Sequence, residues 1–562
     1  MMTARAITTG KTQSAEYDVV IVGAGFSGLY MLHRLRGAGF TARILERASD
    51  VGGTWYWNRY PGARCDVESM QYAYSFSPEL EQQWVWTEQY ATQPEILSYA
   101  NHVADRFDLR CDIQFNTDVL SATYDESARC WRIETKDGPH ISAAFCIMAT
   151  GCLSTTNTPH FEGIETFAGT VYHTGEWPHE AVDFTGQQVG IIGTGSSAIQ
   201  SIPVIAEQAR HLYVFQRTPH YTVPARNRYL QSDPETRHSG RSAYGFDVDL
   251  TIEEIKADYA GLRERARNMF AALAFTPNRK SALEVSESER QREFEARWQS
   301  GGVPFQGAFI DLVSDRQANE TAARFVRQKI GETVHDPVVA KALMPTYTFG
   351  CKRLAVDTGY YETYNRTNVT LVDVSRSPIE RITPNGVRAL GCEYPLDSLI
   401  TATGFDAMTG TLLNIDIRGR RGASLRDKWA EGPTSYLGLG IAGFPNLFTI
   451  TGPGSPSVLT NMLQSIEQHV DWVVACLEYL RERDIPEIEA TPDAEVAWVA
   501  HNNEVANDHI RSSCTSWYIG GNIEGKPRVF MPYVGGFPVY VEKCNEIAAN
   551  GYAGFSLGAV SA

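Results

Sequence analysis

The chain has 562 residues, of which 43% are hydrophobic and 21% charged, and it carries a formal net charge of -16 at pH 7. That length exceeds one compact core and predicts about two to four domains, and the ordinary composition excludes a disordered or fibrous protein. The acidic balance argues against a nucleic-acid-binding protein, which usually carries a basic patch or stripe.

Neither targeting signals nor paired cysteines stand out in the sequence. The polar residues 1–16 lack the apolar core of a secretory signal, and no run of about 18 apolar residues follows them. We therefore expect a mobile tail and a cytoplasmic protein without a membrane partner. The 10 cysteines are scattered, with no C-x-x-C pair and no Cys/His metal spacing, so we expect reduced thiols and no metal site.

The first recognisable unit is residues 17–47, YDVVIVGAGFSGLYMLHRLRGAGFTARILER, whose pattern predicts a strand, a glycine turn, a helix and a second strand. In this context Gly23-x-Gly25-x-x-Gly28 predicts dinucleotide binding, because the glycines permit a tight turn and let the pyrophosphate approach a helix N-terminus. Glu46 ends the second strand, where a carboxylate can accept hydrogen bonds from ribose hydroxyls. The alternative for Glu46 is an exposed strand-end glutamate.

A second unit of the same kind begins at residue 187 with QQVGIIGTGSSAIQ. Its loop reads Gly193-x-Gly195-x-x-Ala198, and alanine is tolerated at the third position. Arg217 stands near the place where the first unit has its acid. A guanidinium can bind a 2'-phosphate that a carboxylate would repel, so this site should prefer NADP unless Arg217 is only a surface arginine. The other candidate binding residues of this loop are Thr194, Ser196, Ser197 and Thr218.

Two dinucleotide sites in one chain imply that a hydride passes from one cofactor to the other. A flavin is the usual partner of a nicotinamide, so we expect FAD at the first site and NADPH at the second. The fold class that follows is α/β, with two Rossmann-like dinucleotide-binding domains, for FAD and NADP, and a helical insertion in the NADP domain.

Composition divides the rest of the chain. The residues 228–345 are charge-dense and helically spaced, which predicts the insertion. Two apolar runs, FCIMATG and LITATGF, each end in a glycine turn and are expected to close a strand where the chain crosses between domains. The expected division is a tail at 1–16, an FAD-binding domain at 17–156 and 401–562, an NADP-binding domain at 157–227 and 346–400, and the insertion at 228–345.

The segment after the first unit indicates which acceptor receives the electrons of the reduced flavin. A disulfide reductase would need two close cysteines beside the flavin, but Cys65 is the only cysteine between Gly23 and Cys111. The sequence GGTWYWNRYPGARCD, residues 52–66, could build an apolar wall with one buried acid, Asp66, beside the flavin. Asp66 could equally be the N-cap of a helix that begins at DVES.

Two longer patterns resemble the type I Baeyer–Villiger monooxygenases. One signature is matched by Gly52-Gly53-x-Trp55, Tyr60-Pro61-Gly62 and Asp66. The family fingerprint is matched at every specified position by Phe167-x-Gly169-x-x-x-His173-Thr174-x-x-Trp177-Pro178. The likeness extends from about residue 17 to residue 556, and several segments look closest to family members that act on phenylacetone and on steroids. N-hydroxylating and other flavin-containing monooxygenases share only a looser version of the fingerprint.

The resemblance implies an NADPH-dependent flavoprotein monooxygenase. In this family NADPH reduces FAD, O2 forms a peroxide at flavin C4a, and this peroxide attacks a ketone to give an ester or lactone. The implied partners are a ketone, expected to be a bulky aryl, cyclic or steroid-like one, and O2, with no obligate protein partner. The alternatives are a monooxygenase that hydroxylates nitrogen or sulfur, and an NADPH sensor without useful turnover.

The resemblance also assigns roles to residues. Arg353 matches the catalytic arginine, which would stabilise the peroxide and the oxyanion of the adduct, and Asp66 would orient it. Lys352 would bind the NADP phosphate beside Arg217 and Thr218. Thr54, Trp55 and Tyr72 would contact the flavin, although Tyr72 could be ordinary core, and Trp517 would fold over NADP. The residues implied to line the substrate pocket are Leu153, Ser457, Val458, Leu459 and Met462, of which Met462 would also contact a cofactor.

The fingerprint FAGTVYHTGEWP invites a catalytic role, because its His173 titrates near neutral pH. Its position between FCIMATG and the second unit favours another interpretation. A segment at the junction of two domains can transmit their relative rotation as NADP moves. We therefore expect its six specified residues to couple the domains: Phe167, Gly169, His173, Thr174, Trp177 and Pro178.

Overall fold

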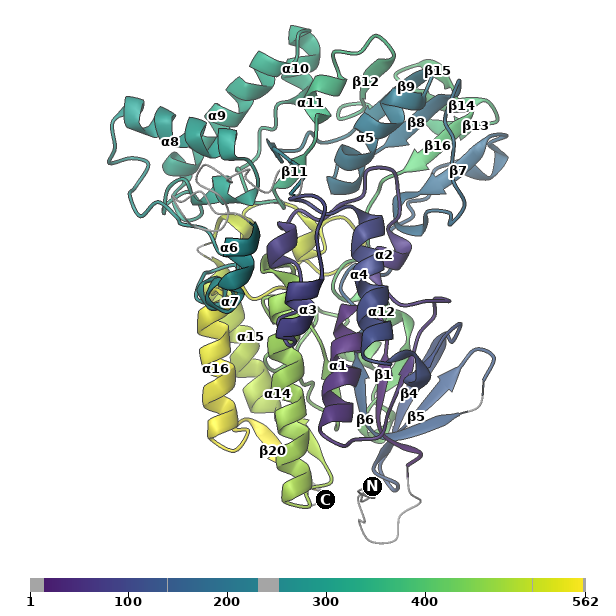
Figure 1. Ribbon diagram of the computed structural model, residues 1–562. Coiled ribbons are helices and arrows are strands. Elements are labelled where there is room, and N and C mark those ends of the chain that lie inside the picture. The colour runs from purple at the N-terminus through teal and green to yellow at the C-terminus, as the bar shows by residue number, and fades with distance from the viewer. Residues whose placement is uncertain (1–14, 139, 231–251, 508, 559–562) are drawn as a thin grey trace.

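The computed structural model describes residues 15–138, 140–230, 252–507 and 509–558. The expected tail at 1–16 thus lies almost wholly outside the described residues. Figure 1 shows two lobes, each built around one sheet, with the N-terminal strand in the lower lobe and the second dinucleotide unit in the upper one. No helix in the described part of the chain has both the length and the apolarity needed to span a bilayer.

The lower lobe contains an eight-stranded sheet around the first unit. Its parallel part runs in the order β3-β2-β1-β6-β18, and β4 and β5 add an antiparallel edge on β6. The inner residues of β1 are fully buried because both faces of the sheet are covered. The strands are β1 (Tyr17–Val22), β2 (Ala42–Leu45), β3 (Ile113–Gln114), β4 (Val119–Asp125), β5 (Cys130–Thr135), β6 (Ile141–Met148), β17 (Asp416–Arg418) and β18 (Leu447–Thr449).

The upper lobe contains a five-stranded, wholly parallel sheet in the order β12-β9-β8-β16-β7. With the first sheet, it confirms the predicted pair of Rossmann-like folds. The strands are β7 (Thr170–His173), β8 (Gln188–Ile192), β9 (His211–Gln216), β12 (Val369–Asp373) and β16 (Ser398–Thr401). The helices that follow the two glycine loops are α1 (Phe26–Gly37) and α5 (Ser196–Gln208).

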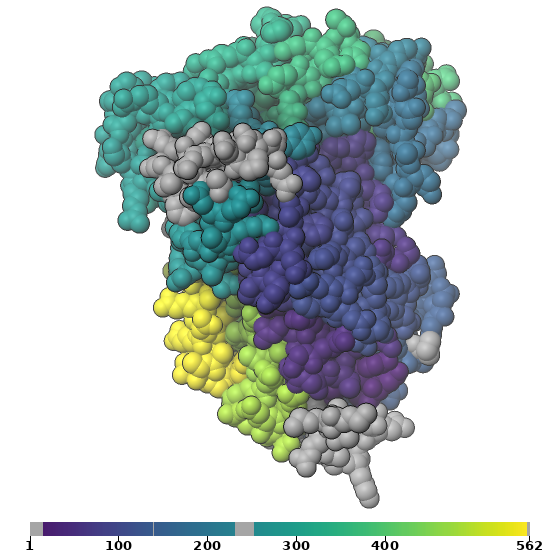
Figure 2. Space-filling model, viewed as in Figure 1, coloured from purple at the N-terminus to yellow at the C-terminus, as the bar shows by residue number. Residues whose placement is uncertain are grey.

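The helices of the expected insertion belong to two different cores. Ile255, Tyr259 and Leu262 are buried with the core of the lower lobe, whereas Phe294 and Phe325 are buried with the core of the upper lobe. Figure 2 shows the first part of this segment, in dark teal, against the blue surface of the N-terminal part. Residues 231–251 lie outside the described chain. The helices are α6 (Ile252–Ala257), α7 (Tyr259–Arg267), α8 (Glu287–Ser300), α9 (Arg316–Thr333) and α10 (Pro337–Leu343).

The two apolar runs that end in glycine occupy equivalent places in the two lobes. FCIMATG includes the end of β6, which pairs with β1, and LITATGF includes the end of β16, which pairs with β8. Gly151 and Gly404, which close the runs, have φ of 69° and 81°. The chains that leave them run side by side, since the N–H of Asn157 donates to the carbonyl of Gly404 at 2.8 Å. After β6 the chain passes from the lower sheet to β7 of the upper sheet, and after β16 it passes back to β17 of the lower sheet.

The remaining elements are mostly short. The other helices are α2 (Thr54–Trp57), α3 (Pro78–Gln83), α4 (Gln93–Arg106), α11 (Tyr360–Thr363), α12 (Gly410–Asn414), α13 (Leu425–Lys428), α14 (Met462–Glu482), α15 (Pro492–Asn507) and α16 (Phe537–Ala549). The other strands are β10 (Thr222–Pro224), β11 (Ala355–Asp357), β13 (Arg381–Thr383), β14 (Gly386–Ala389), β15 (Cys392–Pro395), β19 (Ile488–Ala490) and β20 (Phe555–Leu557). Single turns of 3-10 helix occur at Ser69–Gln71, Arg110–Asp112, Ile164–Thr166, Thr174–Glu176, Val303–Gly307, Arg420–Gly422, Ser457–Leu459, Ile510–Ser512 and Trp517–Ile519.

Candidate active site

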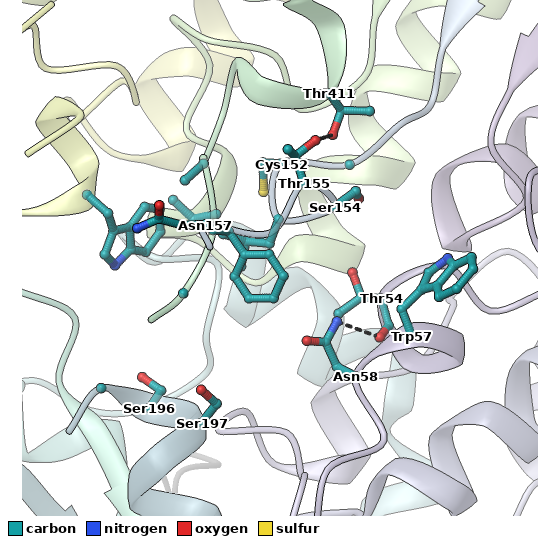
Figure 3. Close-up of a pocket in the computed structure, with 18 of the residues that line it drawn as sticks. Thr54, Trp57, Asn58, Cys152, Ser154, Thr155, Asn157, Ser196, Ser197 and Thr411 are labelled. Atoms are coloured by element: carbon teal, nitrogen blue, oxygen red, sulfur yellow. Dashed lines mark hydrogen bonds between the residues drawn. The ribbon is translucent and has the colours of Figure 1, made fainter. Parts of the chain in front are cut away.

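A cavity of about 1550 Å³ lies between the two lobes and is lined by residues of both. Figure 3 shows Thr54 and Trp57 of α2 and the next residue, Asn58, on one side of it, and Ser196 and Ser197, at the start of α5, on another. The predicted site residues that line it are Gly23, Gly25, Glu46, Thr54, Trp55, Asp66, Tyr72, Leu153, Gly193, Thr194, Gly195, Ser196, Ser197, Arg217, Thr218, Lys352, Arg353, Val458, Met462 and Trp517.

The first glycine loop has the form that a pyrophosphate needs. Gly23 has φ of 105°, and Gly25 caps α1 without any side-chain hydrogen bond, so the N–H groups of the first turn remain available. Glu46 is 6% exposed, and its two carboxylate oxygens accept from the N–H groups of Ala24 at 2.6 Å and Ala48 at 2.7 Å. Burial raises the pKa of Glu46, and these N–H groups act against that rise. The loop and the fixed acid fit the dinucleotide part of FAD.

The second glycine loop repeats this backbone. Gly193 has φ of 116°, and Gly195 caps α5, again without a side-chain hydrogen bond. A Cβ on Gly195 would meet no protein atom within 4 Å, so the loop leaves an open cradle on the cavity side. The hydroxyl of Thr194 donates to the carbonyl of Thr218 at 2.7 Å and so joins the loop to the segment after β9. These features fit a second dinucleotide.

Two cations, Arg217 and Lys352, converge beyond the second loop. Arg217 is exposed directly after β9. Burial lowers the pKa of Lys352, and the nearby charge of Arg217 lowers it further. Within the described ranges no carboxylate forms an ion pair with either side chain. Unpaired cations at close range repel each other and are stabilised by an anion, so this corner of the cavity fits a phosphate.

Arg353 and Asp66 form a bidentate ion pair although 287 residues separate them. The Nε and Nη2 groups of Arg353 donate to the two carboxylate oxygens at 2.8 and 2.9 Å, and Nη1 donates to the carbonyl of Val458 at 2.9 Å. The charge of Asp66 raises the pKa of the guanidinium, which therefore stays charged. Since 32% of the Arg353 side chain is exposed and it lines the cavity, the group can still bind a ligand there. Asp66 is thus not the N-cap of a helix.

Contacts with the upper lobe position the segment that carries Asp66. The hydroxyl of Tyr60 donates to Gln200 Oε1 of α5 at 2.8 Å, and Gln200 Nε2 donates to the carbonyl of Arg64 at 3.0 Å. Gly62 has φ of 79°, and a Cβ there would lie 2.2 Å from the carbonyl oxygen of Gln200. The Tyr-Pro-Gly turn therefore packs closely on α5 and sets the position of the acid against the arginine.

Aromatic side chains form the wall of the cavity next to the first loop. Trp55 and Tyr72 are nearly buried, and Trp55 Nε1 donates to the hydroxyl of Tyr72 at 3.1 Å. Both still line the cavity, as Thr54 does. Their position between the first glycine loop and Asp66 fits contacts with the ring system of a flavin.

The apolar part of the lining surrounds the Arg353 end of the cavity. Cys152, Leu153, Val458 and Met462 line it and belong to one hydrophobic cluster with the neighbouring core. Two residues implied by the resemblance do not reach the lining. Ser457 is fully buried, and its hydroxyl donates to the carbonyl of Thr451 at 3.0 Å. Leu459 is buried in the hydrophobic cluster that contains Cys152 and Val458. The expectation that Ser457 and Leu459 line the pocket is therefore not met.

The fingerprint segment connects the crossing chains with the second loop. The Nδ1 atom of His173 accepts from the N–H of Gly175 at 3.0 Å, so the proton lies on Nε2, which is 3.3 Å from the carbonyl of Asn157 and from Thr403 Oγ1. Burial lowers the pKa of His173, and the ring is neutral at pH 7. The hydroxyls of Thr174 and Ser197 lie 3.1 Å apart.

The other fingerprint residues are packing residues. Trp177 stacks on Tyr172 with a centroid distance of 5.2 Å and is buried in the core of the upper lobe. A Cβ on Gly169 would lie 2.2 Å from the carbonyl oxygen of Asp397, so this position requires glycine. Phe167 packs on the core near β13 and β14. None of these three residues lines the cavity in the described chain.

Some residues of the site carry no sequence signal. His220 lines the cavity, and burial lowers its pKa to about 4, so its neutral Nε2–H donates to the carbonyl of Arg353 at 2.7 Å. Gln200 is also a lining residue. Only their nearness in sequence to Thr218 and to the second loop could have drawn attention to them.

The expectation of reduced thiols is wrong at one pair, because Cys351 and Cys514 form a disulfide bond. The two residues lie 163 positions apart, and neither is part of a spaced motif. Only the tertiary structure therefore brings them together. The other eight cysteines are free.

Comparisons with known proteins agree with this geometry. Residues 20–242 match the pyridine nucleotide-disulphide oxidoreductase family. The chain is 42% identical to a Baeyer–Villiger monooxygenase of Pseudooceanicola batsensis, over 96% of each chain. It is 40% identical to a phenazine N-monooxygenase of Lysobacter antibioticus, over 96% of this chain and 97% of the other. It also resembles the solved structure of an oxidized steroid monooxygenase bound to NADP, with 52% identity, a TM-score of 0.90 and coverage of 96% and 99%.

Proposed function

The chain belongs to the flavin-dependent Baeyer–Villiger monooxygenases, and on this basis we propose that it oxygenates bulky aryl, cyclic or steroid-like ketones with Arg353 as its catalytic residue. Its cofactors are FAD and NADPH, and its products are esters or lactones. The observation that carries the proposed role is the Arg353–Asp66 pair at the wall of the cavity. When bound, the reduced flavin activates O2.

The substrate preference rests on the lining and on one relative. The apolar residues Cys152, Leu153, Val458 and Met462 surround the space next to Arg353 and offer few hydrogen-bonding groups. A similar chain that is 52% identical is a steroid monooxygenase. Both facts support a ketone with a large hydrocarbon frame.

Arg353 can hold a negative oxygen throughout the reaction. Its guanidinium remains charged because Asp66 raises its pKa, and each Nη atom has two hydrogens, so donors remain for a substrate oxygen. A fixed cation beside the ketone carbonyl stabilises the oxyanion that forms when oxygen adds to it. Asp66 fixes the plane of the guanidinium by two hydrogen bonds and partly balances its charge.

The test separates cofactor reduction from oxygen transfer. Arg353→Ala should still oxidise NADPH and reduce FAD, while ester formation should fall by about 10²–10³-fold because the oxyanion loses its charged donor. Stopped-flow flavin absorbance and product analysis measure the two steps. Arg388→Ala, which removes an arginine paired with Glu380 away from the cavity, serves as the matched control and should change neither. Normal ester formation by Arg353→Ala would overturn the assignment.

A second candidate function is oxygenation of a ring nitrogen. It is favoured by the 40% identity to a phenazine N-monooxygenase. Addition to a ketone creates an oxyanion, whereas oxygenation of an amine does not. A panel of linear, cyclic, aryl and steroid ketones together with phenazines should therefore decide between the two, with product identification as the measurement. N-oxides without any ester would favour the second candidate.

We also propose that the fingerprint segment couples the domains. His173 touches both crossing chains, through Asn157 and Thr403, and its neighbour Thr174 touches Ser197 of the second loop. His173→Ala should raise hydrogen peroxide release per NADPH several-fold while leaving some ester formation, because relative motion of the lobes is no longer matched to oxygen transfer. An exposed histidine variant, His140→Ala, is the control. Complete loss of ester in a folded, FAD-loaded variant would instead indicate a direct catalytic role.

A further inference from the structure

A disulfide bond joins two segments next to the cavity. Cys351 directly precedes Lys352 and Arg353, and Cys514 begins the sequence CTSW that carries Trp517. The Cα atoms of the two cysteines are 6.1 Å apart. The bond therefore ties the segment of the active-site arginine to residues 509–529, which we call the Trp517 loop.

The Cys351 end of this bond is firmly anchored. Cys351 is fully buried, and its N–H donates to the carbonyl of Thr348 at 3.2 Å. Asn319 of α9 holds the same turn, since its side chain donates to the carbonyl of Phe349 at 2.8 Å and accepts from the N–H of Phe349 at 2.9 Å. None of these contacts involves the sulfur atom of Cys351, so this end is held by more than the disulfide.

The Cys514 end has fewer contacts of its own, although the loop beyond it is fixed by Asn522, whose Nδ2 donates to the carbonyl of Phe405 at 2.7 Å, and by an ion pair of Lys526 with Asp406. Cys514 is half-buried and follows a turn in which the N–H of Ser513 donates to the carbonyl of Ile510 at 3.0 Å. Neither Cys514 nor Thr515 forms a hydrogen bond with any described residue. Ser516 then accepts from the N–H of Gly521 at 2.8 Å, which is a bond inside the loop itself. The disulfide is thus a covalent anchor at a point that hydrogen bonds do not secure.

We propose that Cys351 and Cys514 form a reversible thiol–disulfide modification site that sets the freedom of the Trp517 loop. A covalent link between a rigid segment and the weakly held residues 513–515 removes conformations from these residues. The oxidised protein should therefore hold the start of the Trp517 loop against the Arg353 segment, and the reduced protein should let this start open more often while the contacts of Asn522 and Lys526 remain. The family resemblance implies that Trp517 folds over NADP, but the tether does not depend on that role.

The exchange chemistry can begin at Cys514, the less buried of the two cysteines. With a hydroperoxide, the Cys514 thiolate takes one oxygen to give a sulfenic acid and water, and Cys351 then attacks that sulfur and releases a second water. Two thiols and one H2O2 thus give one disulfide and two waters. In reduction, a dithiol attacks Sγ of Cys514, Cys351 leaves as a thiolate, and the second thiol of the reagent closes its own disulfide and frees Cys514.

The test compares the FAD-loaded protein after H2O2 and after dithiothreitol. Mass-spectrometric peptide mapping should find peptides of Cys351 and Cys514 linked after H2O2 and separate after dithiothreitol. Trypsin cleavage after Arg511, at the start of the Trp517 loop, should be at least about fivefold slower in the oxidised protein, because cleavage needs local opening. Neither readout requires oxygen transfer, so failure of the proposed function would leave both unchanged.

Two serine variants provide matched comparisons. Cys514→Ser should be cleaved at the rate of the reduced protein and should not respond to either reagent. Cys392→Ser removes an exposed free cysteine and should respond as the unmodified protein does. The proposal is overturned if no linked peptide forms after H2O2, if the two redox states are cleaved equally, or if Cys514→Ser still responds to dithiothreitol.

Discussion

The two glycine loops share a backbone but differ in the third small residue of the motif and in the residue at the end of the following strand. Gly23 and Gly193 have φ of 105° and 116°, and both helices begin without a side-chain cap. In the first unit a Cβ on Gly28 would lie 1.9 Å from the carbonyl oxygen of Gly23, whereas the second unit accommodates the methyl group of the fully buried Ala198. Both loops thus form the same pyrophosphate cradle, but the helices that follow them pack differently against their loops.

The strand ends differ more sharply. Glu46 is buried and held by two backbone N–H groups, whereas Arg217 is exposed and shares its corner with Lys352. A fixed carboxylate suits ribose hydroxyls, and an unpaired guanidinium suits a phosphate. The glycine loop of each unit therefore provides general affinity for a dinucleotide. The residue at the end of the following strand discriminates between the cofactors.

The largest effect should come from the third position of the motif. Gly28→Ala should lower the free energy of unfolding by ~3 kcal/mol and abolish FAD loading, because the new Cβ overlaps a carbonyl oxygen in a closely packed site. Thermal melting and the flavin-to-protein absorbance ratio measure both. The reverse change, Ala198→Gly, should cost only about 1 kcal/mol, the helix-propensity difference. Normal FAD content in Gly28→Ala would show that the two helices pack alike.

An intermediate effect is expected at the first strand end. Glu46→Gln turns one carboxylate oxygen into an amide donor that faces the N–H of Ala24 or Ala48, so the variant should lose roughly 1–3 kcal/mol of stability and bind FAD about tenfold more weakly. Glu134→Gln, at an exposed site on β5, is the control. Titration of the apoprotein with FAD measures the affinity. An unchanged FAD affinity would remove Glu46 from the cofactor site.

The smallest effect is expected at the second strand end, because Arg217 is exposed. Arg217→Ala should raise the KM for NADPH by roughly 3- to 10-fold through loss of a solvent-screened, charge-assisted contact with the 2'-phosphate, and should leave the KM for NADH nearly unchanged. Arg210→Ala, an exposed arginine before β9, should alter neither. Steady-state kinetics with both coenzymes give the answer. Equal effects on NADPH and NADH would contradict a phosphate contact.

The sequence predicted those parts of the molecule that depend on neighbours along the chain. The two strand–loop–helix units, the crossings at FCIMATG and LITATGF and the difference between Glu46 and Arg217 are all local patterns. The split of the expected insertion between two cores could not be predicted, because α6 and α8 have similar charge-dense sequences. The sequence also did not predict that the Ser457 side chain is buried away from the cavity. Its positive φ of 43° and its hydrogen bond to the carbonyl of Thr451 depend on the surrounding fold.

By itself the sequence determined two dinucleotide folds, the expected cofactors and a family resemblance, because spacing, turn sterics and side-chain charge act over short distances. Only the tertiary structure decided which distant residues meet. It brought Arg353 to Asp66, His220 to the carbonyl of Arg353, and Cys351 to Cys514. Such pairs depend on how two lobes and their crossing chains pack together, and the physical reason is that packing depends on surfaces contributed by the whole chain rather than by any one segment.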